Sequence, residues 1–365
     1  MALSWAIAGG GTGGHVTPAL ALGEAIAARG DHVVFIGSER GLESKLVPDA
    51  GFELVALGSQ QVMGRSLLGR LLGVLGIVGQ VGAARSALRA NDADVVVSVG
   101  GYAAMPTAIA AVLTRRPLVL VEPNAIPGRV NRLTARFAKL VFVGFDRASL
   151  VLDSGRPTIH QTGIPLRSGL LDAFASAPPR KAPEPPLHLF VFGGSQGARQ
   201  INEAMMEIAP KLAELPVEIF HQTGEADRER VAQAYAEAGV RAEVAAFEHE
   251  MPTRYRWADL ALCRAGALTV AELALAGLPA LLVPYPFAAD DHQTANAKAL
   301  AESGAGRCLD SRPLDIHELT DELTELLLAP DTLARMSASA SALARPNAAR
   351  DVVDTTARLL REGAP

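Results

Sequence analysis

The chain has 365 residues, which at roughly 100 to 200 residues per domain predicts two domains. Hydrophobic residues make up 49% of it and charged residues 20%, a composition that excludes disordered, collagen-like and disulfide-stapled proteins. The net charge of −5 is unevenly divided, because residues 1–167 hold 16 basic and 11 acidic side chains whereas residues 168–365 hold 18 and 28. The basic first half suits an anionic partner. The two cysteines, Cys263 and Cys308, allow at most one disulfide bond and indicate a reducing compartment.

Short apolar runs rich in β-branched residues alternate with alanine- and leucine-rich runs of helical period along the chain. This alternation predicts parallel strands connected by helices, an α/β architecture with ligands at the carboxyl ends of the strands. No run of about 20 apolar residues predicts a membrane-spanning helix, and residues 1–22 lack the pattern of a signal peptide. In chain order, the predicted strands are Ser4–Ala8, His32–Ile36, Val95–Val99, Leu118–Val121, Leu140–Val143, His188–Phe192, Val217–His221, Leu260–Cys263 and Ala280–Val283.

Glycine-rich loops follow several of these strands. Gly9-x-Gly11-x-x-Gly14 matches the pattern GxGxxG, in which bare backbone N–H groups at a helix N-terminus bind phosphate. Similar loops occur at Val99–Tyr102 and Gly193–Gly197. Each loop alone is also consistent with a tight turn that needs small residues. Three of them favour a reaction whose donor and acceptor both carry pyrophosphate.

A fourth candidate for phosphate binding is the segment Cys263–Glu272, where a predicted strand becomes a helix. The positive end of the helix dipole near Ala267–Thr269 could hold a departing diphosphate without a metal ion. Glu272, one turn further on, could accept hydrogen bonds from ribose hydroxyls. The alternative is that Glu272 is a solvated helix residue.

The strand, glycine loop and helix start at the beginning of the chain recur about 185 residues later, which predicts two Rossmann-like domains in tandem. We place the first domain at residues 1–167 and the second at residues 168–345. The five prolines of Asp172–Pro186 predict a linker, or an exposed loop close to it. Because Pro346 interrupts the C-terminal region, we expect residues 346–365 to form a helix that packs back on the first domain.

The motifs GGGTGGHVTPAL, GGYAAMP, GGSQGARQIN and CRAGALTVAELALAGLPALLVPYP, followed by DHQTAN, together resemble the MurG family over nearly the whole chain. The resemblance implies an inverting hexosyltransferase that moves N-acetylglucosamine (GlcNAc) from UDP-GlcNAc to the C4 hydroxyl of undecaprenyl-pyrophosphoryl-MurNAc-pentapeptide. This step converts lipid I into lipid II in peptidoglycan synthesis.

The resemblance also implies a GT-B fold, in which two Rossmann-like domains face each other across a cleft, the first binding the acceptor and the second the donor. The expected place is peripheral, at the cytoplasmic face of the cell inner membrane. No cofactor and no nucleic-acid partner is expected, and proteins of cell-wall synthesis and division, which determine cell shape, are candidate partners.

Individual residues carry implied roles. Thr12, Gly13 and Gly14 would lie near the donor sugar and the acceptor diphosphate, with His15 beside them. The backbone at Glu248 would contact the uracil. The remaining implied contacts are Asn124, Gln293 and Asn296 with the sugar, Arg167 and Ser195 with the diphosphate, and Ala267, Leu268, Thr269, Val270, Ala271 and Glu272 with the nucleotide.

The chain departs from the family in the segment around Glu122. Val121 and Pro123 stand where the family has His and Gln, so any role of that histidine cannot apply here. His15 is therefore the preferred general base, since an unperturbed pKa of about 6.5 leaves much of it neutral in the cytosol. Glu122 is the alternative base. Anion binding or helix capping by His15, without proton transfer, is the competing interpretation. Ile164 stands where the family's TGNP motif has Asn, which weakens a polar contact there.

No metal ion is expected, because Asp290 and Asp291 are adjacent and lack the spaced Asp-x-Asp pattern of many metal-dependent glycosyltransferases. We therefore predict donor binding that tolerates EDTA. A second expectation concerns the membrane. Residues 54–91 hold no acidic side chain, and four arginines, at 65, 70, 85 and 89, flank an apolar stretch that could lie on anionic lipid. A buried helix followed by a glycine-rich loop is the alternative.

Three other functions remain open from the sequence. A UDP-GlcNAc 2-epimerase would share the UDP site but would need no lipid acceptor. An NAD-dependent oxidoreductase would use the first glycine loop, but the acidic residue after the next strand, Glu39, lies 25 residues beyond Gly14 and the second Rossmann-like half would be unexplained. A non-catalytic nucleotide-sugar sensor would explain the departures near Glu122.

Overall fold

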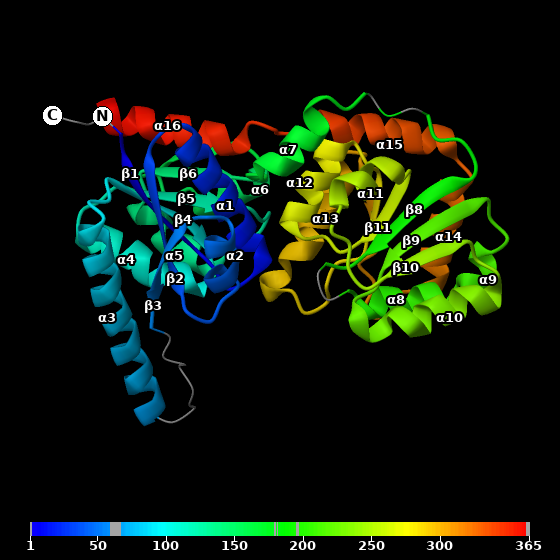
Figure 1. The fold of residues 1–365 in the computed structure, drawn as a ribbon, viewed down its shortest axis with the longest axis horizontal. Helices are drawn as coiled ribbons and strands as arrows, with labels where there is room; N and C mark the ends of the chain where they lie inside the picture. Colours follow the sequence, from blue (N-terminus) through cyan, green and yellow to red (C-terminus); the bar gives the residue numbers. More distant parts are fainter. Residues whose placement is uncertain (1, 59–66, 179, 181, 195–196, 363–365) are drawn as a thin grey trace. The chain divides into compact units, whose positions relative to one another are not determined.

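The computed structural model describes residues 2–58, 67–178, 180, 182–194 and 197–362, with the backbone alone for residues 67–77. The chain divides into two compact units. The N-terminal unit comprises residues 1–168 and 345–365, and the C-terminal unit comprises residues 169–344. Each unit is a parallel sheet covered by helices (Figure 1).

The described part of the N-terminal unit contains a seven-stranded sheet in the order β3-β2-β1-β4-β5-β6-β7. Its strands are β1 (Ser4–Gly9), β2 (His32–Ser38), β3 (Glu53–Leu57), β4 (Val95–Gly100), β5 (Leu118–Glu122), β6 (Leu140–Val143) and β7 (Thr158–Gln161). Its helices are α1 (Gly13–Ala28), α2 (Glu43–Asp49), α3 (Leu67–Ala90), α4 (Met105–Leu113), α5 (Arg129–Thr134), α6 (Asp146–Leu152) and α16 (Ala348–Glu362), with 3-10 turns η1 (Tyr102–Ala104) and η2 (Ala135–Phe137).

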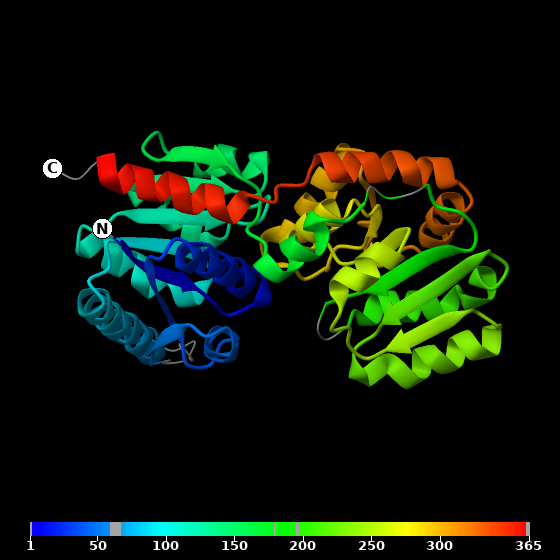
Figure 2. The ribbon, with the colours of Figure 1, turned by 45° about the horizontal axis from the view of Figure 1, so that its top comes forward.

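Both faces of this sheet are buried, as the near-continuous apolar strands require. One face packs on α1, α2 and α16, around Trp5, Leu20 and Val352. The other packs on α3, α4 and α6, around Ala87, Ala108 and other small side chains. The C-terminal helix α16 lies along α1 (Figures 1 and 2), and Arg29 at the end of α1 pairs with Asp354 of α16.

The described part of the C-terminal unit contains a six-stranded sheet in the order β10-β9-β8-β11-β12-β13. Its strands are β8 (Leu187–Phe192), β9 (Val217–Gln222), β10 (Ala242–Ala245), β11 (Leu260–Cys263), β12 (Ala280–Leu282) and β13 (Gly306–Cys308). Its helices are α7 (Ser168–Ala175, which begins at the boundary), α8 (Arg199–Glu207), α9 (Ala209–Leu212), α10 (Arg228–Ala238), α11 (Met251–Trp257), α12 (Ala267–Ala276), α13 (His292–Glu302), α14 (Ile316–Leu327) and α15 (Pro330–Ala342), with η3 (Glu225–Asp227) and η4 (Ala289–Asp291).

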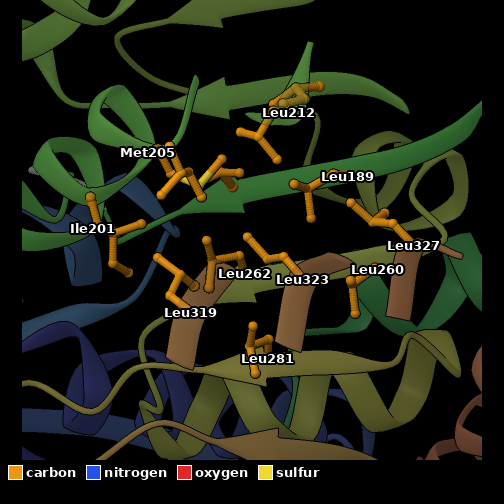
Figure 3. Close-up of a cluster of buried hydrophobic side chains, with 14 of the residues drawn as sticks. Leu189, Ile201, Met205, Leu212, Leu260, Leu262, Leu281, Leu319, Leu323 and Leu327 are labelled. Carbon is orange, nitrogen blue, oxygen red and sulfur yellow. The ribbon is translucent and has the colours of Figure 1, made fainter. Parts of the chain in front are cut away.

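The core of this unit is a leucine-rich layer on one face of the sheet (Figure 3). Leu189 and Leu262 of the strands meet Met205 of α8 and Leu319 and Leu323 of α14 there. The opposite face carries aromatic side chains. Tyr255 of α11 lies edge-on to Phe190 and Phe192 of β8.

All nine predicted strands are confirmed, within a few residues at their ends. The four strands that the sequence pattern missed are β3, β7, β10 and β13, and these are the outer strands of the two sheets. The predicted linker 172–186 begins inside α7, so its first four residues are helical, and the division between the units falls before it, at residues 168 and 169. The helix expected near the C-terminus is α16.

Candidate functional site

Each sheet has a point at which the strand order reverses, and a glycine loop lies there in both units. In the C-terminal unit this point lies between β8 and β11, and in the N-terminal unit between β1 and β4. Ligands of open α/β sheets bind in the crevice outside the carboxyl ends of the strands at such switch points. The predicted phosphate loops therefore lie where the topology favours binding.

A cavity of about 840 Å³ opens at the switch point of the C-terminal unit. It contains the predicted contact residues Thr269 and Gln293 and is bounded by the N-terminal ends of α8 and α12. Its lining residues are Phe192, Gly193, Gly194, Gly197, Ala198, Arg199, Gln200, Glu203, Arg264, Gly266, Thr269, Tyr285, Pro286, Phe287, Gln293, Arg312 and Pro313.

The glycine loop beside this cavity needs its glycines for close backbone approach. Gly197 has φ of +73°, and a Cβ atom on it would lie 1.8 Å from the carbonyl oxygen of Thr223. A Cβ on Gly193 would lie 2.2 Å from that of Ala198. The predicted diphosphate contact Ser195 lies outside the described residues. The loop thus brings bare backbone against the start of α8, which is the geometry of an anion-binding turn.

Three arginines line the same cavity, and the sequence reasoning did not single out any of them. Arg264 follows β11 directly and donates from Nη1 to Gln200 Oε1 at 2.9 Å and to the carbonyls of Val283 and Pro284 at 3.1 Å. Burial lowers its pKa to about 10, which keeps it charged at neutral pH. Arg199 and Arg312 lie on the exposed rim. With the N-terminal ends of α8 and α12, these cations make the cavity suitable for a diphosphate.

Glu272 lies one turn and a half into α12, with its side chain half-buried. The hydroxyl of Tyr255, which is fully buried on α11, donates to Glu272 Oε2 at 2.7 Å. Burial raises the pKa of Glu272 to about 7, against the opposing effect of this hydrogen bond. Glu272 is therefore a structured carboxylate and not a solvated helix residue.

The other predicted donor residues fall into two groups. Gln293 lines the cavity, and its Oε1 accepts a hydrogen bond from the N–H of Tyr285 at 2.9 Å. Asn296 is fully buried and donates to the carbonyl of Ala265 at 3.1 Å, so it supports the turn that precedes α12. The remaining predicted nucleotide contacts lie in the first turns of α12. Ala267 and Val270 are buried there, and Leu268, Thr269 and Ala271 are half-buried.

Glu248 stabilises the start of α11. Its Oε2 accepts from Arg254 Nε at 2.6 Å and its Oε1 from the N–H of Glu250. Partial burial raises the pKa of Glu248, but the hydrogen bond and charge of Arg254 outweigh it, so the pKa is lowered. The neighbouring ring of Phe247 is 48% exposed. The Glu248 side chain is thus engaged within the protein, which leaves its backbone for the predicted base contact.

A buried polar network lies behind the glycine loop of the C-terminal unit. Asn202 of α8 donates from Nδ2 to the carbonyl of Thr223 and to Asp227, both at 2.9 Å, so its Oδ1 is the acceptor for His221 Nε2 at 3.1 Å. His221 Nδ1 in turn accepts from the Tyr235 hydroxyl at 2.9 Å. Because burial lowers the pKa of His221 to about 3, the ring is neutral. The network fixes Thr223, against which Gly197 packs.

In the N-terminal unit, the glycine loops after β1 and β4 touch each other. Gly101 has φ of +80°, and a Cβ on it would lie 2.4 Å from the carbonyl oxygen of Gly10. His15 lies half-buried beside both loops, with its Nδ1 3.0 Å from Thr12 Oγ1. Gly13 and Gly14 form the first turn of α1, next to His15. The predicted base is thus held at the switch point of this unit.

Glu43 is a residue that the sequence reasoning missed. It is 1% exposed and accepts hydrogen bonds from the N–H of Gly11 at 2.9 Å and of Ser38 at 3.0 Å. A Cβ on Gly10 would lie 2.3 Å from its Oε1. Because Glu43 is distant in sequence from the loop that it contacts, no pattern of neighbouring residues predicts this contact. It shapes the first glycine loop from beneath.

Glu122 is also buried, at 1% exposure. Its carboxylate accepts from the N–H groups of Asn124 at 3.0 Å and Gly128 at 2.9 Å, from the Asn124 side chain at 3.4 Å and from the Asn131 side chain at 2.9 Å. Burial raises its pKa, against these hydrogen bonds. Glu122 therefore organises the segment from Asn124 to α5. Arg167 pairs with Glu24 inside the same unit.

Two doubly wound α/β units, each with a glycine loop at its switch point, are the architecture expected of a GT-B glycosyltransferase. The comparisons with known proteins agree. Residues 5–143 match the glycosyltransferase family 28 N-terminal domain, and residues 188–352 match the glycosyltransferase family 28 C-terminal domain.

Two examples describe the relatives named UDP-N-acetylglucosamine--N-acetylmuramyl-(pentapeptide) pyrophosphoryl-undecaprenol N-acetylglucosamine transferase. The one from Anaeromyxobacter sp. (strain Fw109-5) is 42% identical over 359 residues, covering 97% of this chain and 93% of the relative. The one from Pseudomonas fluorescens (strain SBW25) is 42% identical over 351 residues, covering 95% and 96%. The crystal structure of Acinetobacter baumannii MurG is 32% identical, with a TM-score of 0.80 over 97% of this chain and 98% of that one. The chain belongs to the MurG family of glycosyltransferases.

Proposed function

We propose that the protein transfers GlcNAc from UDP-GlcNAc to the C4 hydroxyl of undecaprenyl-pyrophosphoryl-MurNAc-pentapeptide, making lipid II from lipid I. The two relatives described above are named as transferases of N-acetylglucosamine from its UDP derivative to N-acetylmuramyl-(pentapeptide) pyrophosphoryl-undecaprenol, which supports this proposal. The observation that carries the donor half of the proposal is the C-terminal cavity, which combines helix N-terminal ends and arginines. Glu272 does not line this cavity; it lies three residues beyond the lining residue Thr269, on the same face of α12. The cavity is a site for a nucleoside diphosphate linked to a sugar.

In this proposal the C-terminal unit holds the donor. The diphosphate lies against the Gly193–Gly197 loop and the N-terminal end of α12, near Arg264. Glu272 accepts hydrogen bonds from the ribose hydroxyls, and Gln293 contacts the GlcNAc. The leaving UDP is then stabilised by fixed dipoles and cations that need no reorganisation during the reaction.

The N-terminal unit holds the acceptor, and His15 is the general base that takes the proton of the C4 hydroxyl. The tautomer in which Nδ1–H donates to Thr12 Oγ1 puts the basic lone pair on Nε2. A positioned base contributes about 10² to 10⁴-fold to the rate. We therefore expect His15→Ala and His15→Gln to lose at least tenfold in kcat, while His317→Gln, at an exposed position of α14, keeps it. A smaller loss at His15 would exclude base catalysis by this residue.

Incubation with UDP-GlcNAc and a short-chain lipid I analogue tests the reaction itself. We expect a disaccharide product. An epimerase would instead form UDP-ManNAc, and a sensor or an oxidoreductase would form neither product.

Donor binding is proposed to need no divalent cation, because arginines supply the positive charge. Asp291 of the Asp290-Asp291 pair is engaged by Arg312 and accepts from the Thr294 hydroxyl at 2.8 Å. Burial raises the pKa of Asp291, but these hydrogen bonds and the nearby positive charges together outweigh it, so the pKa is lowered. UDP affinity measured with and without EDTA checks this. A loss on chelation that Mg²⁺ restores would contradict it.

We also propose that the enzyme is peripheral on anionic membranes through the face formed by α3, α4 and η2. Leu113 of α4 and Phe137 of η2 are exposed, and Arg136 lies 4.7 Å from the Phe137 ring centre. Arg85 and Arg89 are exposed residues of α3, Arg65 lies outside the described residues, and only the backbone of Arg70 is described. No described helix has both the length and the hydropathy needed to cross a bilayer.

Sedimentation with anionic vesicles at low salt tests the membrane proposal. We expect the wild-type protein to sediment with vesicles that contain anionic lipid and the Arg85→Glu/Arg89→Glu variant to do so less, since each Arg near the surface contributes about 1 kcal/mol. A wild-type protein that ignores the vesicles would refute it.

A further inference from the structure

We infer that Tyr255 is a positioning residue for the nucleotide-sugar donor: its buried hydroxyl holds the Glu272 carboxylate in the orientation that receives the ribose hydroxyls. The inference rests on the donor site proposed above. It adds Tyr255, which does not line the cavity and which contacts Glu272, three residues beyond the lining residue Thr269 on α12.

The hydrogen bond between Tyr255 and Glu272 engages one of the two carboxylate oxygens and leaves the other for the ligand. Tyr255 Oη donates to Oε2 of Glu272 at 2.7 Å, and no described residue donates to Oε1. Glu272 is half-buried, and the hydrogen bond to one of its oxygens restricts the rotation of the carboxylate, so it also limits the directions that Oε1 can take. An ionised carboxylate only accepts hydrogen bonds, which suits the ribose hydroxyls as donors.

Tyr255 is itself held on two sides. Its ring is fully buried, 6.0 Å from the rings of Phe190 and Phe192 at interplanar angles of 64° and 66°. Its carbonyl accepts from Arg180 Nη1 at 2.8 Å, and Arg180 also bonds the carbonyl of Ala258. The hydroxyl therefore cannot move away from Glu272 without breaking this packing.

Arg180 belongs to the proline-rich segment before β8 and joins the ends of two helices. Besides its bonds at the end of α11, its Nη1 lies 3.4 Å from the carbonyl of Ala276 at the end of α12. A cation at helix C-termini is favourable because the carbonyls there carry partial negative charge. The distance between α11, which carries Tyr255, and α12, which carries Glu272, is thus set both by Arg180 and by the hydroxyl contact.

The charges and burial around Tyr255 and Glu272 predict that UDP binding depends on pH. The groups that face Glu272 are the Tyr255 hydroxyl from α11 and the Cys263 thiol from β11, and burial raises the pKa of both, so both are neutral at pH 7. No described residue of α13 or α15 forms an ion pair with Glu272. Burial brings the Glu272 pKa to about 7, and the Tyr255 hydrogen bond opposes that rise. Loss of the hydroxyl should move the pKa of Glu272 further up.

The test is the dissociation constant of UDP, measured by calorimetry on the full chain between about pH 6 and pH 9. For the wild type we expect the affinity to fall as the pH drops through about 7, where Glu272 takes up a proton. Tyr255→Phe should bind UDP about three- to tenfold more weakly at neutral pH, the range that corresponds to one typical intramolecular hydrogen bond, and its affinity should fall at higher pH than in the wild type. In Glu272→Gln the pH dependence should disappear.

Two controls separate positioning from general damage. Thr356→Val also removes a buried hydroxyl, one that bonds the Val352 carbonyl inside α16 of the N-terminal unit, and should keep the wild-type UDP affinity and pH profile. With 2′,3′-dideoxy-UDP as the ligand, the penalty of Tyr255→Phe should vanish, because no ribose hydroxyl remains to be oriented. If Tyr255→Phe does not fold, Glu272→Asp tests the same contact, since the shorter carboxylate cannot reach the Tyr255 hydroxyl and should also weaken UDP binding.

The outcomes distinguish the inference from the proposed function. Wild-type affinity and pH profile in Tyr255→Phe, or an equal penalty with the dideoxy ligand, would overturn the role of Tyr255 and leave the donor site standing. In the Glu272→Asp experiment, unchanged UDP affinity would overturn the role of Tyr255 together with the ribose contact proposed for Glu272, while the diphosphate site near Arg264 would stand. A wild-type protein that binds no UDP at any pH would instead remove the donor site and the inference together.

Discussion

Acidification should destabilise the C-terminal unit through His221, which the fold keeps neutral. The ring is fully buried, and both of its nitrogens are used, Nε2 on Asn202 and Nδ1 on Tyr235. Burial lowers its pKa from 6.5 to about 3, against a smaller opposing effect of the Asp227 charge. In the unfolded chain the same ring takes up a proton near its ordinary pKa.

The sign and size of the effect follow from proton linkage. Between about pH 6.5 and pH 3 the unfolded state binds the proton and the folded state does not, so the free energy of unfolding decreases as the pH falls. From about pH 8 to pH 5.5 the free energy of unfolding should fall by about 1.4 kcal/mol because of His221. This value follows because pH 5.5 lies about one pH unit below the pKa of 6.5 in the unfolded state, and one unit corresponds to about 1.4 kcal/mol. With a urea dependence of about 2 kcal/mol per molar, the unfolding midpoint should drop by about 0.7 M from this residue alone.

Urea titrations followed by fluorescence measure this loss. The chain has two tryptophans, so a Trp5→Phe background leaves Trp257 of α11 to report on the C-terminal unit. His221→Gln in this background should be less stable at about pH 8 but should lose about 1.4 kcal/mol less than its parent on acidification to about pH 5.5. His317→Gln removes an exposed histidine of the same unit and should keep the parental loss. Equal acid losses in His221→Gln and its parent would refute the reasoning.

Two further predictions concern the glycine loops. Gly197→Ala should weaken UDP binding at least about tenfold in calorimetry, because the new Cβ would lie 1.8 Å from the Thr223 carbonyl oxygen and the loop would have to move. The control is Gly169→Ala, whose new Cβ would meet nothing within 4 Å and which should bind UDP normally. Equal UDP affinities of the two variants would contradict the packing argument. Glu43→Gln should lower the unfolding free energy of the N-terminal unit, followed by Trp5 fluorescence, by about 1–3 kcal/mol, because one of two backbone N–H groups then faces an amide donor. The exposed Glu53→Gln is its control, and a matching stability of the two variants would show that Glu43 does not hold the loop.

The strands that the sequence predicted and those it missed differ in their place in the sheet. Central parallel strands such as β4 and β11 are buried on both faces, so they appear in the sequence as continuous apolar runs. The outer strands β3, β7, β10 and β13 have a neighbour on one side only and carry exposed or half-buried residues, such as Glu53 and Glu243. Their apolar signal is correspondingly weak, and pairing with the neighbouring strand decides that they are strands.

The candidate site divides in the same way. The glycine loops and the start of α12 were predictable, because strand, glycine and helix follow one another directly in the chain. The sequence did not predict the fixed side-chain contacts of Glu272, nor the roles of Arg264 and Tyr255. They depend on hydrogen bonds between residues that are distant in sequence, such as Arg264 with Gln200.

The sequence by itself determined the α/β class, the order of the central strands along the chain, the positions of the glycine loops and the family. These properties depend on residue types at short spacing, which a linear pattern records. Only the tertiary structure decided which polar groups lose contact with water. Glu43, Glu122 and His221 are ordinary residues in the printed chain, and they acquire fixed partners and, for Glu122 and His221, shifted pKa values because folding buries them among backbone N–H groups and side chains contributed by other elements.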